Sequence, residues 1–234
     1  MSDAEDSVQL PVPHVIQQTQ WDCGLACSQM ALKYGLGDAF SADHFTTICK
    51  ELNFGESVWT IDIAHIVTRH GLKHLLCTQT LGVDSGYKKE DFYEDTFNED
   101  EKRVNALFKN AASLGIHTQK RSVSISEIHR HLSQEQVAVV LTNSELLDCK
   151  LCPEEERDTS QQGGKLSGIL SLTCCRSVPY TGHFIVVCGY DRRDGTVYYK
   201  NPACYSDLCC CSVKDFNRAR KSYGTDEDIL FIYR

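Results

Sequence analysis

The spacing of apolar residues predicts helices early in the chain and strands later. Residues 23–34 are apolar over a face wide enough for a buried helix, and Gly37 lies where such a helix would stop. Residues 60–72 carry a narrower apolar stripe, with Thr60 as the expected N-cap. The pattern therefore predicts two early helices and puts Cys23 in the first turn of one of them.

Shorter elements follow in the rest of the chain. Ser124 and Glu127 form a capping box at the start of a short helix, and residues 183–191 are apolar on both faces, as in a covered strand. Further helices are expected at 98–115 and 212–222, and further strands at 72–80, 116–123, 137–143, 196–203 and 228–234.

We expect one α+β domain with two lobes. Residues 1–13, with three acids and two prolines, are interpreted as a flexible leader. A helix-rich lobe covers 14–143, and a β-rich lobe covers 177–234. The stretch 144–176 lacks apolar periodicity, so we interpret it as a mobile insertion within the single domain 14–234.

Charge and hydropathy exclude two classes of partner. With 24 basic and 32 acidic residues, the formal net charge is −8, the wrong sign for a nucleic-acid backbone. Apolar runs are far shorter than the roughly 20 residues that cross a bilayer, and the first residues do not form a secretory signal. We therefore expect a monomeric cytoplasmic protein, with nuclear entry left open, that binds no nucleic acid and has no membrane span.

Thirteen cysteines without an export signal indicate a reducing compartment and mostly free thiols. Cys23 is the candidate nucleophile, because unpaired N–H groups at a helix N-terminus stabilise a thiolate. Asp22 opposes this effect, and an unreactive buried thiol is the alternative interpretation. Gln17, six residues earlier, could form an oxyanion hole with the Cys23 backbone N–H.

His183 is the candidate general base, because it begins the most apolar strand, where a polar ring needs a partner or a role. With a hairpin loop of about five residues, Asn201 pairs near Ile185 and can orient the His183 imidazole. A core histidine beside an Asn-Pro turn is the alternative. A cysteine on an early helix with its base and orienting residue on later strands is the arrangement of papain-type thiol catalysis.

Three blocks of the sequence resemble the bacteriocin-processing leader peptidases, which are papain-like enzymes. The first is QTQWDCGLACSQMALKYG, directly preceded by Gln17, so that five residues separate Gln17 from Cys-Gly-Leu-Ala-Cys. GHFIVVCGYD with YYKNPA resembles their His and Asp-Pro blocks, and TIDIAHIVTRHGL resembles the helix between them. Over nearly its whole length the chain also resembles the eukaryotic guanylyl cyclase domain-containing protein family, whose name states a different activity.

The resemblance to the peptidases implies a papain-like cysteine hydrolase fold, with a helical N-terminal lobe and an antiparallel-sheet C-terminal lobe. It assigns Gln17 to the oxyanion hole, Cys23 as nucleophile, His183 as base and Asn201 as orienting residue. The peptidases usually carry Asp at the last position, whereas papain-like enzymes also use Asn. Cys27, one helical turn after Cys23, is then a core residue.

We therefore expect a thiol hydrolase or acyl transferase with a Cys-His-Asn triad, acting on a protein or peptide substrate without a cofactor. A guanylyl cyclase is one alternative. It needs two carboxylates for Mg²⁺ and basic groups for a triphosphate, and the sequence shows neither as a motif. The other alternative is an inactive papain-like module that binds protein partners.

The later cysteines raise the question of metal binding. Cys149 and Cys152 form a Cys-x-x-Cys pair. Two further groups follow it: Cys174 and Cys175, and then Cys204, Cys209, Cys210 and Cys211. A structural zinc site usually pairs two Cys-x-x-Cys knuckles, and this chain has one, so we expect no metal. Zinc held by four of these thiolates stays an alternative, as do acylation and redox sensing.

Overall fold

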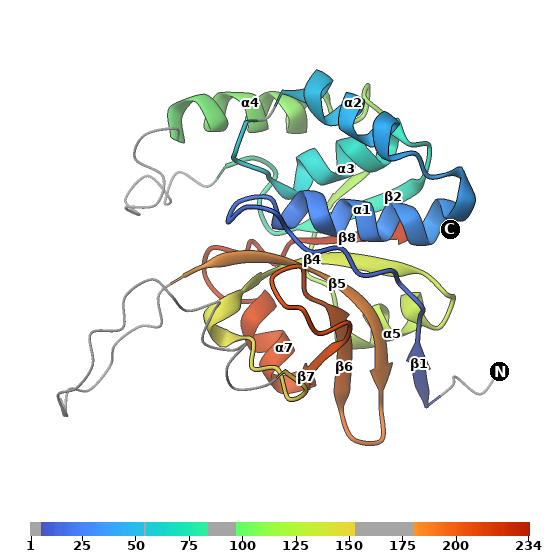
Figure 1. Cartoon of the computed structure of the whole chain (residues 1–234). Coiled ribbons are helices and arrows are strands. Elements are labelled where there is room, and N and C mark those ends of the chain that lie inside the picture. Colours follow the sequence, from blue (N-terminus) through green and yellow to red (C-terminus); the bar gives the residue numbers. More distant parts are fainter. Residues whose placement is uncertain (1–5, 54, 84–96, 153–179) are drawn as a thin grey trace, which may run out of the picture.

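The computed structural model describes residues 6–53, 55–83, 97–152 and 180–234 (Figure 1). One eight-stranded sheet has the order β3-β2-β8-β4-β5-β6-β7, and β1 pairs with β5 off this path. The strands are β1 (Ser7–Gln9), β2 (Lys73–Thr78), β3 (Thr118–Lys120), β4 (Val137–Asn143), β5 (Gly182–Asp191), β6 (Thr196–Lys200), β7 (Cys209–Ser212) and β8 (Ile229–Tyr233). The helices are α1 (Cys23–Leu36), α2 (Ala42–Leu52), α3 (Thr60–Arg69), α4 (Phe97–Asn110), α5 (Ile125–Leu132) and α7 (Val213–Arg220), with 3₁₀ turns at Gly37–Ala39 and Ser144–Leu146.

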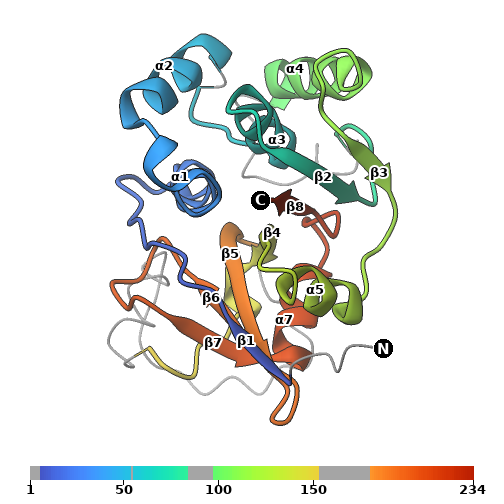
Figure 2. The same ribbon diagram turned by 90° about the vertical axis from the view of Figure 1, so that its right-hand side faces the viewer.

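Helices cover both faces of the central strands, so the fold is α+β as expected. Figures 1 and 2 show α1 to α4 on one side of β4, β5 and β8, and α5 and α7 on the other. The central strands β4 and β5 are buried along almost their whole length, which explains why their sequences are apolar on both faces. Among the described helices, none is long and apolar enough to cross a bilayer.

The strands of the first half of the chain belong to the same sheet as those of the second half, which the sequence did not indicate. β2 pairs in parallel with β3 and antiparallel with β8, which joins the predicted helix-rich lobe to the β-rich one. A local hydrophobic pattern identifies a strand but not the strand that it pairs with. One sheet therefore connects the two lobes.

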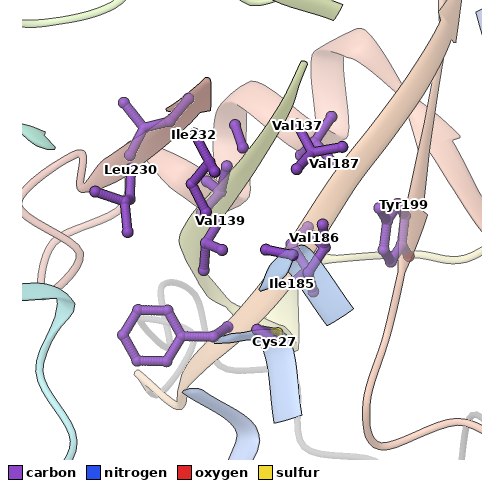
Figure 3. Close-up of a cluster of buried hydrophobic side chains, with 14 of the residues drawn as sticks. Cys27, Val137, Val139, Ile185, Val186, Val187, Tyr199, Leu230 and Ile232 are labelled. Atoms are coloured by element: carbon purple, nitrogen blue, oxygen red, sulfur yellow. The ribbon is translucent and has the colours of Figure 1, made fainter. Parts of the chain in front are cut away.

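The core lies between α1 and the central strands. Figure 3 shows Cys27 of α1 next to Ile185 and Val186 of β5, with Val139 of β4 and Leu230 of β8 nearby. None of these five side chains is exposed to solvent. Burial of each aliphatic side chain contributes about 1.5–3 kcal/mol. Cys27 is thus a core residue, as the resemblance to the peptidases implied.

The start of α3 differs from its prediction by one residue. Trp59 is the N-cap, and Thr60 is the first helical residue. The Asp62 carboxylate accepts the Trp59 backbone N–H at 2.9 Å, so an acid in the first turn replaces the expected threonine cap. At the start of α5, the Ser124 hydroxyl accepts the Glu127 N–H at 3.2 Å, which confirms that cap.

Residues 6–13 do not form the flexible leader that the sequence predicted. β1 pairs antiparallel with the far end of β5, and Leu10 and Val12 are buried. The acids and prolines of this segment concealed a short edge strand, because its partner lies about 180 residues later in the chain.

The described part of the predicted insertion is packed against the protein. Residues 144–146 form a 3₁₀ turn, and Cys149 and Cys152 are buried. Residues 153–176 of the predicted insertion lie outside the described residues. The α2 helix was not predicted, because its composition is mostly polar and only Phe45 and Ile48 are buried.

Candidate active site

Cys23 is the first residue of α1, where a short loop turns into the helix. The Asp22 carboxylate accepts the backbone N–H groups of Gln18 at 3.1 Å and Thr19 at 2.9 Å, which fixes the loop. The Cys23 side chain is 7% exposed, and its sulfur accepts the backbone N–H of Gly24. Such first-turn N–H groups have no partner within a helix and are free to stabilise a thiolate.

His183 reaches the same place from β5. It is the second residue of this strand and pairs with Thr142 of β4, whose hydroxyl donates to the His183 carbonyl oxygen at 2.9 Å. The His183 ring is hydrogen-bonded to the Cys23 thiol, and the N–H of Phe184 donates to the same sulfur. The β5 strand thus contributes two groups to the surroundings of Cys23.

Asn201 follows β6 and lies on the other side of the imidazole. The pairing of β5 with β6 ends at Val186 opposite Lys200, so the next residue, Asn201, falls beside Ile185, in line with the predicted register. Asn201 Oδ1 lies 2.8 Å from His183 Nε2. Because Nε2 is engaged with the amide, Nδ1 is the ring nitrogen left to face Cys23. The structure thus brings together Cys23, His183 and Asn201.

The electrostatics of the Cys23–His183 pair favour charge separation. Burial raises the pKa of Cys23, but the hydrogen bond and charge of His183 and the N–H groups of Phe184 and Gly24 outweigh it, so the pKa is lowered. Burial lowers the pKa of His183, and the bonds to Cys23 and Asn201 outweigh it, so that pKa is raised. Both shifts favour a thiolate beside an imidazolium.

Gln17 lines the same cleft. Its backbone N–H donates to the Pro202 carbonyl oxygen at 2.9 Å, which ties the loop before α1 to the turn after β6. Its side-chain Nε2 donates to the Thr19 carbonyl oxygen at 2.8 Å. An amide nitrogen carries two hydrogens, so this bond leaves one for an oxyanion near Cys23.

These side chains line a cleft of about 1230 Å³. Trp21, Trp59 and Tyr205 supply aromatic surface along it. The cleft also contains five carboxylates among the residues described: Glu56, Glu99, Asp100, Asp226 and Asp228. Arg103, which also lines it, is held by Asp62 at 2.5 Å and Asp100 at 3.2 Å. The cleft is therefore acidic as well as aromatic.

Sequence analysis did not identify His14 or Asp228 as part of this region. His14 Nε2 lies 2.9 Å from the Asn201 carbonyl oxygen, a contact between residues 187 positions apart. Burial raises the pKa of Asp228 to about 7. Both arise from tertiary packing, so no local pattern in the sequence signals them.

A cysteine at a helix N-terminus, facing histidine and asparagine on adjacent strands of an α+β fold, defines the papain-like class. A solved structure from Bacillus anthracis, described as a C39-like peptidase, has the same fold, with a TM-score of 0.53, 98% coverage of both chains and 15% sequence identity. At this identity the likeness establishes the fold and not the reaction.

The chain belongs to the family described as guanylylate cyclase, which matches residues 12–232. Guanylyl cyclase 1 of Arabidopsis thaliana is 35% identical over 227 residues, which span 97% of this chain and 77% of that relative. The family expected from the sequence is therefore confirmed. The fold and the family description point to different chemistries.

Proposed function

We propose that this protein is a papain-like thiol hydrolase that cleaves an amide bond in a protein or peptide. The hydrogen bonds that link Cys23 to His183 and His183 to Asn201 are the observation that carries the proposal. They join a sulfur whose pKa is lowered to a ring whose pKa is raised, inside a cleft of about 1230 Å³. This combination is what nucleophilic catalysis by a thiol requires.

In the first half of the reaction the Cys23 thiolate attacks the substrate carbonyl carbon, and a C–S bond forms. The carbonyl electron pair moves to oxygen, where the Cys23 backbone N–H and the Gln17 amide donate to the oxyanion. The tetrahedral intermediate collapses as the C–N bond breaks, and the His183 imidazolium gives its proton to the departing amine. A thioester on Cys23 is left.

In the second half, neutral His183 takes a proton from water, and the hydroxide attacks the thioester carbon. The C–S bond then breaks, which releases the acid and restores the thiolate–imidazolium pair. Asn201 keeps the ring oriented through Nε2 during both halves. An amine or thiol in place of water would make the same site a transferase.

The test compares cells that carry the native protein with cells that carry Cys23→Ala, and identifies new protein N-termini by mass spectrometry. Cys27→Ala is the matched control, because Cys27 lies one turn further along α1 and is fully buried. We expect N-termini that depend on Cys23 and not on Cys27. Identical sets of N-termini in all three lines would contradict peptide cleavage and favour a binding module.

Guanylyl cyclase activity is the second candidate, favoured by the family description and by the name of the Arabidopsis relative. The carboxylates of the cleft would need bound cations before a triphosphate could approach, because Arg103 is already held by Asp62 and Asp100. GTP turnover by purified protein, dependent on Mg²⁺ and unchanged in Cys23→Ser, would support the cyclase and contradict the hydrolase.

A further inference from the structure

Four cysteine side chains gather next to Asn201: Cys149 and Cys152 from the loop after β4, Cys204 from the turn between β6 and β7, and Cys209 from the start of β7. The sulfur atoms of Cys149, Cys152 and Cys209 lie within 4.8 Å of one another, and those of Cys152 and Cys209 are 3.3 Å apart. Cys204 is hydrogen-bonded to Cys209 and Cys152. All four residues are buried and at most 7% exposed.

The loop at Cys149 has backbone contacts that suit a metal-bound thiolate. The Cys152 N–H points at Cys149 Sγ at 3.4 Å, and the N–H groups of Leu151 and Cys210 also donate to this sulfur. A sulfur that accepts several backbone N–H groups is stabilised in its charged form. The Lys150 N–H donates to the Cys210 carbonyl oxygen at 2.9 Å, which fastens this loop to β7.

We propose that Cys149, Cys152, Cys204 and Cys209 bind one Zn²⁺ ion as a tetrahedral four-thiolate structural site. Zinc–sulfur bonds of about 2.3 Å put the sulfurs of such a site about 3.8 Å apart. The sulfurs of Cys149, Cys152 and Cys209 already lie within 4.8 Å of one another, and Cys204, hydrogen-bonded to two of them, is the fourth ligand and moves in to complete the site. The sequence favoured a metal-free protein because it has one Cys-x-x-Cys. The second pair, Cys204 and Cys209, has four residues between its members and is brought together by the turn between β6 and β7.

The site would also act on Asn201. Asn201 Nδ2 donates to Cys204 Sγ at 3.1 Å, while its Oδ1 faces His183 Nε2. A zinc-bound thiolate only accepts hydrogen bonds, so the amide nitrogen must point toward Cys204 and the oxygen toward His183. Cys204 is thus a positioning residue for the imidazole, and the metal would keep the Asn201 amide from flipping.

The experiment measures metal content in the full chain, purified under reducing conditions without chelators. We expect about one zinc ion per chain and, by X-ray absorption, four sulfur ligands at about 2.3 Å. The double variant Cys149→Ser/Cys209→Ser should lose the zinc. Cys210→Ser is the matched control, because this buried residue of the same Cys-Cys-Cys run is not one of the four proposed ligands, and it should retain the zinc.

The measurements on the native chain do not depend on whether a variant folds. Cobalt exchanged into the native protein should give the visible spectrum of a tetrahedral thiolate site. Native protein that contains no zinc and takes up none when it is added would overturn the proposal. So would a ligand sphere dominated by nitrogen or oxygen, zinc retained in the double variant, or a disulfide between two of the four cysteines in protein isolated under native conditions.

Discussion

Cys23 and Cys27 lie one helical turn apart on α1, and their surroundings push their pKa values in opposite directions. Cys23 accepts hydrogen bonds from His183 and two backbone N–H groups, which lower its pKa. Burial and the charge of Cys23 raise the pKa of Cys27 well above its usual value. Residue type therefore says little about a thiol, and its hydrogen-bond donors decide whether it can act as a nucleophile.

This contrast predicts how the two thiols react with iodoacetamide. Labelling of Cys23 should reach half of its maximal rate below the usual thiol pKa of about 8.5, because the reactive thiolate already exists at lower pH. His183→Ala should move this midpoint up and slow labelling at about pH 6 by roughly tenfold or more. Peptide mass spectrometry at several pH values measures both, and Cys27 should stay unlabelled in the folded protein.

Equal labelling rates for Cys23 and Cys49 at neutral pH would contradict this prediction, because burial raises the pKa of the half-buried Cys49 thiol to about 11. A midpoint for Cys23 that is unchanged in His183→Ala would contradict the role given to the imidazole.

The sequence predicted the residues of the Cys23 site better than it predicted the cysteine cluster next to that site. Cys23 and His183 carry local signals, a loop that opens a helix and a polar residue at the start of an apolar strand. Asn201 followed from the geometry of one hairpin, and the structure has that register. The cysteine cluster around Cys149 could not be predicted in this way, because its members come from separate segments of the chain that only the complete sheet brings together.

At the scale of elements, the close approach of α1 to β5 decides whether Cys23 meets His183. Gly24 makes this approach possible. A Cβ atom there would lie 3.0 Å from Val58 Cγ1, 3.2 Å from Ile63 Cδ1 and 3.2 Å from Phe184 Cδ2. Three buried or half-buried side chains would have to move for a single methyl group.

Gly24→Ala should therefore push α1 away from β5. We expect it to lower the free energy of unfolding by about 1–3 kcal/mol in urea denaturation, although alanine favours helix formation. It should also slow the alkylation of Cys23, because His183 is next to Phe184. Ala26→Gly is the control: it costs helix propensity without adding atoms, so it should destabilise the protein and leave Cys23 labelling unchanged. A Gly24→Ala protein with native labelling would contradict the prediction.

Asp228, just before β8, makes stability depend on pH. Burial raises its pKa to about 7, so it is protonated in the folded protein and ionised in the unfolded chain between about pH 4 and 7. Its contribution to stability is fully present below about pH 4 and is lost as the pH rises through about 7. The Oδ1 atom is buried without a hydrogen-bond partner among the described residues.

Asp228→Asn should remove this dependence. Relative to the native protein, the variant should gain stability as the pH rises from about 4 to 8, by at most about 4 kcal/mol. Urea denaturation at several pH values measures this gain. Asp226→Asn is the control, because the Asp226 carboxylate already accepts the Thr80 hydroxyl at 3.0 Å. The same gain in both variants would show that it does not come from Asp228.

The elements themselves were predicted unevenly. α1, α3 and α5 have apolar stripes and stop signals that a sequence reveals. β1 and α2 do not, since β1 is three residues long and α2 buries only two side chains. β1 is placed by its pairing with β5, about 180 residues later in the chain, and α2 by its packing against α3, which no apolar pattern within α2 itself indicates.

For the whole molecule, one sheet that passes through both lobes predicts a single cooperative unfolding transition. Ile66 on α3 and Val197 on β6 are both buried, and each belongs to a different lobe. Ile66→Ala should cost about 2–5 kcal/mol and Val197→Ala somewhat less. In each variant, the midpoint from tryptophan fluorescence should match the midpoint from far-ultraviolet circular dichroism.

Different midpoints from the two probes would show that the lobes unfold separately. Trp21 and Trp59 lie near α1 and α3, so fluorescence follows the helical side, whereas circular dichroism follows the whole chain. A Val197→Ala variant that shifted only the circular dichroism midpoint would contradict a single domain.

The position of β8 has a consequence for the way the protein is made. This strand follows every other described element in the chain, yet it lies in the middle of the sheet, between β2 and β4. A ribosome releases β2 more than 150 residues before β8, so the edges of β2 and β4 that pair with β8 stay unpaired during synthesis. Until residues 229–233 emerge, the sheet that aligns β5 against α1 is incomplete. We therefore expect the Cys23 thiol to meet His183 only after residues 229–233 have been made, which is about 200 residues after Cys23 itself.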